Sequence, residues 1–166
     1  RLAPMQTSLA DFIRDTHEGR EADAILRSCV HCGFCNATCP TYQLLGDELD
    51  GPRGRIYLIK QFLEGEASGE VTRQHLDRCL TCRSCETTCP SGVQYARLAD
   101  IGRELTEKTV PRPALSKALR MTLRQVVPYR KRIAPVLAMG RWVRRALPSS
   151  LRAKVPPRQR PGPWPV

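Results

Sequence analysis

Eight cysteines, placed in two runs with the same spacing, are the side chains in this 166-residue sequence best suited to chemistry. The runs extend from Cys29 to Pro40 and from Cys79 to Pro90, and each reads C-x2-C-x2-C-x3-C-P. Thiolates at this spacing bind iron–sulfur clusters. The two runs use every cysteine of the chain: Cys29, Cys32, Cys35, Cys39, Cys79, Cys82, Cys85 and Cys89.

The spacing also predicts how the cysteines are shared between clusters. Three thiolates two residues apart wrap one face of a cubane, whereas three further residues carry the fourth thiolate away. In two-cluster proteins with this spacing the fourth cysteine ligates the other cluster. We therefore expect two 4Fe-4S clusters, with crossed ligands that make the two runs one folding unit. The first cluster is expected on Cys29, Cys32, Cys35 and Cys89, and the second on Cys79, Cys82, Cys85 and Cys39.

Two other uses of eight cysteines compete with this prediction. Four disulfides are typical of small secreted chains whose cysteines are spread through loops, which is not the pattern here. Structural zinc needs only paired C-x2-C units, so the third cysteine and the Cys-Pro pair of each run would have no explanation. Both alternatives fit the sequence less well than iron–sulfur ligation.

Four residues between the cysteines have candidate roles. His31 is either a hydrogen-bond donor to a cluster sulfur or an ordinary turn residue, and Phe34 is expected to shield the cluster from water. Gly33 is expected to allow close approach of the backbone or a positive φ, although Arg83 stands at the same place in the second run. Beside an anionic cluster Arg83 would raise the reduction potential, and surface solvation is the alternative.

Length and composition place the chain among proteins of one ordinary domain. Aromatic residues make up 5% of it, so the clusters are expected to replace part of the core and the apoprotein to fold poorly. No apolar run suits a membrane span or a signal peptide. We expect a reducing, cytoplasmic location, free or peripheral on the inner face of the membrane, and Met5 as the natural start.

Charge divides the chain at Thr109. Fourteen Lys or Arg and no Asp or Glu lie from there to the end, against thirteen basic and sixteen acidic residues before it. The net charges of −3 and +14 give the +11 of the whole chain. This asymmetry indicates a partner for the tail. We expect an N-terminal arm over residues 1–20, a cluster domain over 21–108 and a connector or docking tail over 109–166.

The cluster domain is predicted to be all α-helical, because alternating β-branched residues are scarce. Asp50 and Gly51 are expected to cap a helix that starts at Pro52 and ends near Gly65, with Ile56, Ile59 and Leu63 on one face. Other helical stretches are predicted over about 21–27, 69–77 and 93–108, and a short one from Ser8 with Phe12 and Ile13 in the core.

The tail is expected to be irregular, since it holds ten of the fourteen prolines. Short basic amphipathic pieces are predicted over 113–127 and 135–147. A connector or docking arm that folds on a partner is the first interpretation. A membrane surface is the second, since Trp142 and Leu147 accompany arginines. Nucleic acid is an unlikely partner, because no aromatic stacking platform accompanies the charge.

Three stretches resemble the glycolate oxidase iron–sulfur subunit family. They are the first cysteine run with its continuation Pro-Thr-Tyr, the segment Asp-Gly-Pro-Arg-Gly-Arg-Ile at 50–56, and the second run through Val93. The resemblance implies an α-helical ferredoxin domain followed by two domains with Cys-Cys-Gly motifs. No cysteine follows Cys89, so this sequence is expected to be a fragment or a truncated product.

The resemblance also implies a function. Flavin-containing subunits would oxidise glycolate to glyoxylate, and this subunit would pass the electrons to a downstream acceptor, membrane-bound or quinone-linked. Related subunits serve lactate and glycerol-3-phosphate dehydrogenases. The residues alone show no acid–base pair, nucleophile or phosphate loop, so no catalytic residue is expected. A zinc-stabilised module that binds nucleic acid or membrane through its basic tail is the alternative of another class.

Overall fold

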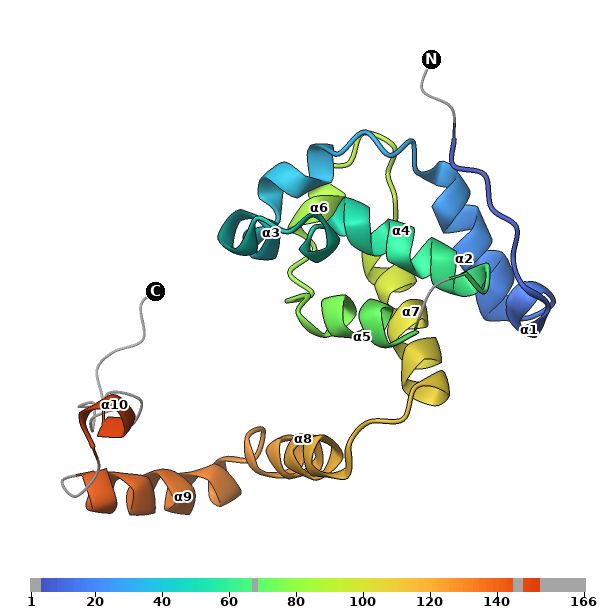
Figure 1. Cartoon of the computed structure of the whole chain (residues 1–166). Helices are drawn as coiled ribbons and strands as arrows, with labels where there is room; N and C mark the ends of the chain where they lie inside the picture. The colour runs from blue at the N-terminus through green and yellow to red at the C-terminus, as the bar shows by residue number, and fades with distance from the viewer. Residues whose placement is uncertain (1–3, 67–68, 145–147, 153–166) are drawn as a thin grey trace. The chain divides into compact units, whose positions relative to one another are not determined.

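The computed structural model describes residues 4–66, 69–144 and 148–152, and every regular element in these ranges is a helix (Figure 1). The all-α prediction is therefore confirmed for the described part of the chain. Contacts divide the chain into two units, Arg1–Pro111 and Arg112–Val166. The two units are described separately below.

The first unit begins with two helices, α1 (Asp11–Arg14) and α2 (His17–Ser28). α2 starts earlier than predicted because Thr16 caps it, accepting a hydrogen bond from the Gly19 N–H at 3.0 Å. Ile13 is buried as expected. The prediction for Phe12 is wrong: its side chain is 52% exposed and only lies against Phe62, with the ring centroids 6.2 Å apart.

Four short or medium helices follow the first cysteines. They are η1 (Phe34–Thr38), α3 (Pro40–Leu45), η2 (Glu48–Asp50) and α4 (Pro52–Leu63). Pro52 opens α4 as predicted, and Gly51 is its N-cap without a side-chain cap. The prediction that Asp50 caps this helix is wrong, because its carboxylate is buried among cationic side chains.

The second cysteine run lies between α5 (Gly69–Asp77) and α7 (Tyr95–Thr109), with the single turn α6 (Ser84–Thr87) inside it. α5 has the predicted bounds, and α7 starts two residues later than predicted. The expected pair on α7 forms, with Lys108 Nζ 2.7 Å from Glu104 Oε1. α5 leads into the cysteine run and α7 follows it. Both helices lie on the same side of α4 (Figure 1).

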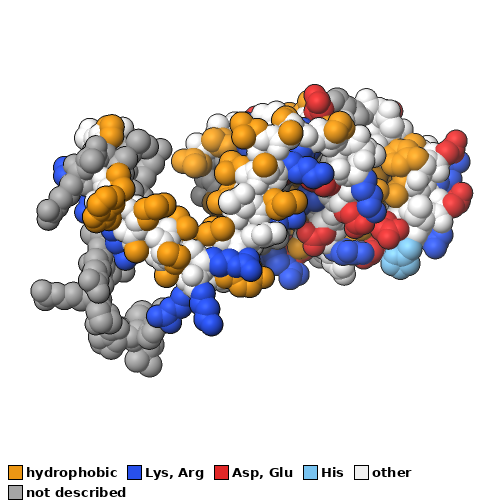
Figure 2. Space-filling model, turned by 90° about the horizontal axis from the view of Figure 1, so that it is seen from below, with side chains coloured by type: hydrophobic (Ala, Val, Ile, Leu, Met, Phe, Trp, Pro, Cys, Tyr) orange, Lys and Arg blue, Asp and Glu red, His pale blue; other side chains and the backbone are white. Residues whose placement is uncertain are grey.

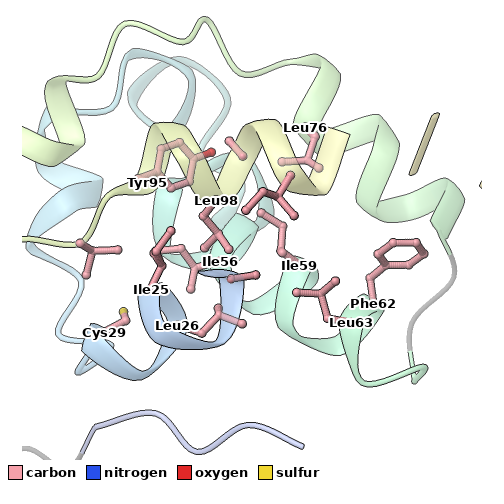
Figure 3. Packing of buried hydrophobic residues seen from close by; sticks show 14 of the residues in the cluster. Ile25, Leu26, Cys29, Ile56, Ile59, Phe62, Leu63, Leu76, Tyr95 and Leu98 are labelled. Atoms are coloured by element: carbon pink, nitrogen blue, oxygen red, sulfur yellow. The ribbon is translucent and has the colours of Figure 1, made fainter. Parts of the chain in front are cut away.

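The core forms where α4 packs against α2, α5 and α7. Figure 3 shows Leu98 of α7 beside Ile56 and Ile59 of α4, with Leu26 of α2 on the same cluster. Leu26, Ile59 and Leu98 have no exposed surface. Cys29 belongs to this cluster too, so the apolar core holds one edge of the cysteine site in place.

The Leu98→Ala substitution is expected to lower the free energy of unfolding by about 2–5 kcal/mol, because it leaves a cavity in the middle of this packing. The melting temperature of the cluster-loaded protein, followed by circular dichroism, should fall by roughly 8 °C or more. The control is Leu44→Ala, since Leu44 is 83% exposed. Equal melting temperatures for the two variants would refute this account of the core.

The second unit contains α8 (Ala114–Val126), α9 (Arg130–Val143) and the single turn α10 (Ser149–Arg152). Neither α8 nor α9 has a buried residue. The predicted start of the second basic piece is wrong, because α9 begins at Arg130 and continues through Pro135. Residues 145–147 of that piece lie outside the described residues.

Candidate iron–sulfur site

The two cysteine runs fold into the same backbone loop. His31 and Gly33 in the first run have φ of 54° and 86°, and Thr81 and Arg83 at the matching places have 56° and 62°. Successive amides in such left-handed turns point toward the inside of the loop. The left-handed expectation for Gly33 is confirmed, and Arg83 adopts the same conformation at a cost of about 1–2 kcal/mol. The fold therefore holds strain in both loops.

These loops line two cavities that lie next to each other. The first cavity is lined by five cysteines: Cys29, Cys32, Cys35, Cys85 and Cys89. The second is lined by Cys39, Cys79, Cys82 and Cys85. Pro52, Cys85 and Tyr95 line both cavities and so form their common wall. The second cavity thus contains three cysteines of the second run and Cys39 of the first. The first cavity contains three cysteines of the first run and Cys89 of the second, together with the shared Cys85.

The thiols fit the cationic iron–sulfur core of a cluster, to which they would bind as thiolates. All eight cysteines are free. Burial, together with the neighbouring Cys29, raises the pKa of Cys35 to about 11. Burial, followed by Cys35 and Cys79, raises the pKa of Cys85 to about 12. Buried thiols that disfavour one another as anions need a bound cation to become thiolates, and soft thiolates are the ligands of iron–sulfur clusters.

Each cavity has one cysteine at the molecular surface. Cys32 and Cys82 are exposed, whereas Cys29, Cys39 and Cys85 are buried. Hydrogen bonds from the backbone and hydroxyl of Ser84 lower the pKa of Cys82. Solvent exposure is one of the properties that set the reduction potential of such clusters.

The candidate residues between the cysteines lie as follows. His31 lines the first cavity, stacks on Tyr57 with ring centroids 5.9 Å apart, and its backbone N–H lies 3.4 Å from Cys29 Sγ. Arg83 lines the second cavity but is 67% exposed and paired with Glu86 at 2.7 Å. The prediction for Phe34 is wrong, because it is 63% exposed and outside the cavity lining.

Tyr95 is a site residue that the sequence analysis did not single out. It is buried, lines both cavities, and donates a hydrogen bond from its hydroxyl to Cys79 Sγ at 3.6 Å. Burial raises its pKa well above the ordinary value, so it stays a neutral donor. Its place directly after the second run, at the start of α7, was the available signal.

A buried polar group beside the second cavity was also missed. Arg55 is 1% exposed and Asp50 is fully buried. Arg55 lies 3.4 Å from Asp50 Oδ1, which also contacts His75 Nδ1 at 2.9 Å, and Arg78 Nη1 donates to Asp50 Oδ2 at 2.8 Å. Burial disfavours ionisation of Asp50, but the hydrogen bonds from His75 and Arg78 outweigh it and lower its pKa.

The family comparison identifies the class of site. Residues 25–93 match the family described as the 4Fe-4S dicluster domain. This range contains all eight cysteines and both cavities. The chain therefore carries a dicluster domain, which binds two 4Fe-4S clusters and transfers electrons. The match favours 4Fe-4S ligation over structural zinc, and the eight free cysteines do not form the disulfides of the other alternative.

Named relatives indicate which kind of 4Fe-4S dicluster protein this chain resembles. The chain is 60% identical over 152 residues to the glycolate oxidase iron-sulfur subunit of Escherichia coli (strain K12), covering 92% of this chain and 37% of that protein. It is 33% identical over 145 residues to the probable glycolate oxidase iron-sulfur subunit of Bacillus subtilis (strain 168), covering 84% of this chain and 32% of that protein. A more distant relative is the succinate dehydrogenase iron-sulfur subunit of Paracoccus denitrificans, at 30% over 105 residues, covering 58% of this chain and 40% of that protein.

This chain is thus a homologue of glycolate oxidase iron–sulfur subunits, and it spans about a third of the length of those relatives. The resemblance inferred from the cysteine runs is confirmed. Among the helices that the structure describes, none combines the length and the apolar composition needed to cross a membrane.

Proposed function

We propose that this chain is the electron relay of a flavin-dependent complex that oxidises glycolate to glyoxylate. The observation that carries the proposal is the pair of adjacent cysteine cavities with a common wall, in a homologue of glycolate oxidase iron–sulfur subunits. A 4Fe-4S cluster takes one electron at a time, so flavin on a partner subunit would divide the two electrons of the substrate. The chain holds the clusters, and the substrate site lies on the partner.

The ligands that we propose are the crossed sets: Cys29, Cys32, Cys35 and Cys89 for the first cluster, and Cys39, Cys79, Cys82 and Cys85 for the second. Support comes from the lining of the two cavities. Cys89 follows α6 yet lines the cavity of the first run, and Cys39 follows η1 yet lines that of the second. Tyr95 and Pro52 would exclude water from the wall between the clusters.

The test is anaerobic reduction of the assembled complex. Glycolate, lactate and glycerol 3-phosphate are added separately, and flavin and cluster reduction are followed by absorbance and by electron paramagnetic resonance (EPR). Glycolate should reduce the flavin first and the clusters next. Cluster reduction by lactate or glycerol 3-phosphate alone would assign the chain to a related dehydrogenase. Clusters that stay oxidised while glycolate reduces the flavin would contradict the relay.

The second unit is proposed to dock onto an acidic face of a partner subunit. Leu115, Leu119 and Leu123 lie on one exposed face of α8, and Lys117 and Arg124 lie on the opposite face. In Figure 2 basic and hydrophobic side chains cover the described part of this unit, while acidic side chains lie on the first unit. An exposed helix with both faces available favours binding to a surface.

Deletion of residues 112–166 is expected to abolish co-purification with the flavin subunits, because it removes all fourteen basic residues that follow Thr109 and the apolar face of α8. The deletion falls at the boundary between the two units, so iron content should stay the same. A control in which Lys117 and Arg124 become Gln separates charge from apolar contact. Full co-purification of the deleted protein would refute the docking proposal, and binding of the intact chain only to anionic vesicles would favour a membrane surface.

A further inference from the structure

The second cavity has a buried guanidinium on its wall. Arg55 projects from α4, and its Nε donates to the carbonyl oxygen of His75 at 2.8 Å. Its Nη1 lies 3.1 Å from the Thr41 hydroxyl and 3.9 Å from Cys39 Sγ. The hydroxyl of Thr41 lies in turn 3.2 Å from the same sulfur. Arg55 is therefore fixed with one edge directed at a proposed cluster ligand.

The charge of Arg55 is only partly balanced by protein. The buried carboxylate of Asp50 is shared by Arg55, whose side chain is 1% exposed, by Arg78, whose side chain is 43% exposed and partly screened by water, and by the imidazole of His75. Asp47 lies near this group, but its carboxylate is exposed to water and accepts the Leu49 N–H at 2.9 Å. Burying an excess positive charge is costly unless an anion lies close by. A cluster with four thiolate ligands is such an anion.

The first cavity has no equivalent among the described residues. Arg53 lines it, but the Arg53 side chain is 46% exposed and lies 3.7 Å from Glu48. Water and a neighbouring carboxylate screen a charge in this position. A buried charge in a low dielectric acts on its surroundings much more strongly than an exposed one. The two cavities therefore differ in the strength of the positive field that acts on them.

This difference has a redox consequence, because reduction adds a negative charge to a cluster. A fixed cation stabilises the reduced state, and net charge and hydrogen bonds to sulfur are among the factors that set cluster potentials.

We propose that Arg55, oriented by Asp50, raises the reduction potential of the second cluster above that of the first. An electron shared by the two clusters then resides mainly on the cluster of Cys39, Cys79, Cys82 and Cys85. The transfer moves one electron: the first cluster is oxidised, the second is reduced, and no bond is made or broken. The inference rests on the proposed crossed ligands and relay function.

The experiment is an EPR-monitored redox titration of the cluster-loaded protein and its variants. Arg55→Met removes the charge and keeps an unbranched apolar side chain that fills part of the same space. It should lower the higher midpoint potential by at least about 59 mV. For a one-electron couple this is a tenfold change in how the electron is distributed between the clusters. Arg55→Lys should restore most of this shift. Arg53→Met is the matched control from the same helix. It should change the electron distribution less than about threefold, because water and Glu48 already screen the charge of Arg53.

Asp50→Asn provides a test of opposite sign. Removing the carboxylate unmasks Arg55, so the same midpoint should rise, whereas loss of structure alone would move both variants in one direction. If Arg55→Met binds a single cluster, the Asp50→Asn result decides: a higher midpoint supports the inference, and an unchanged or lower one overturns it. Two intact clusters with an unchanged midpoint in Arg55→Met would also overturn it.

The outcomes separate this inference from the proposed function. A Cys39→Ala protein, which should retain the first cluster alone, identifies the midpoint that belongs to that cluster. Clusters that glycolate cannot reduce through the flavin subunits would count against the relay. Clusters that are reduced normally, but whose potentials do not respond to Arg55, would count against the role of Arg55 only.

Discussion

The Cys39→Ala variant should contain about four irons per chain and lose the spin coupling between clusters, because it removes one ligand of the second cluster. Cys89→Ala should likewise retain about four irons, since Cys89 lines the first cavity. The single variants alone do not reveal whether the ligands cross. Pairs of substitutions do.

If the ligands cross, Cys39 and Cys79 serve one cluster. The double variant Cys39→Ala/Cys79→Ala should then keep about four irons, like either single variant, whereas Cys39→Ala/Cys29→Ala should keep almost none. Iron analysis and EPR of the dithionite-reduced proteins measure both. The reverse pattern, with iron retained in the second double variant and lost in the first, would show that each run binds its own cluster.

The Gly54→Ala substitution is expected to lower both the stability and the iron content of the protein. A Cβ at this position of α4 would lie 2.1 Å from the carbonyl oxygen of Glu48 and 2.8 Å from Leu49 Cα. Both neighbours are backbone, so a side-chain rotation cannot relieve the clash. α4 would have to move away from η2, carrying Arg53 and Arg55 away from the two cavities.

We expect Gly54→Ala to lower the free energy of unfolding by roughly 3 kcal/mol and the melting temperature by roughly 12 °C or more, with reduced iron content. Gly46→Ala is the control. Gly46 has φ of 66°, but a Cβ there would meet nothing within 4 Å, so only conformational strain of about 1 kcal/mol is added. A Gly54→Ala protein as stable and as rich in iron as Gly46→Ala would show that α4 and η2 are not packed this closely.

The parts of the fold that were predictable depend on local patterns. The cysteine spacing predicted a domain with two 4Fe-4S clusters, and Pro52 and the apolar repeat after it predicted α4. α5 was predicted with its observed bounds. In each case residues near one another in the sequence determine the outcome, so the sequence contained the whole signal.

The parts that were missed depend on distant partners. An aspartate before Gly-Pro looks like a helix cap, but Asp50 instead binds His75, which is twenty-five residues away in the sequence. Nothing local to Arg55 distinguishes it from a surface arginine on a helix. Phe12 and Phe34 were predicted to be covered, yet few side chains surround them. Burial is set by tertiary packing, which a short sequence window does not contain.

The start of α9 was predicted wrongly at Pro135 for a different reason. Its ring removes one backbone hydrogen bond, which predicts that a helix starts at this residue. The structure keeps α9 continuous from Arg130, with the Arg132 guanidinium 4.6 Å from the ring centroid of Tyr129 and donating to the Gln125 carbonyl at 2.8 Å. Contacts of the residues before the proline stabilise the first turn, and a local rule for proline does not include them.

The central claim is that this chain binds two neighbouring 4Fe-4S clusters that exchange electrons. The most direct test measures iron and acid-labile sulfide in protein purified without oxygen, together with the EPR spectrum after dithionite reduction. The account predicts about eight irons and eight sulfides per chain, with a spectrum broadened by coupling between two reduced clusters. About four irons with an uncoupled signal, or zinc with no signal, would contradict it.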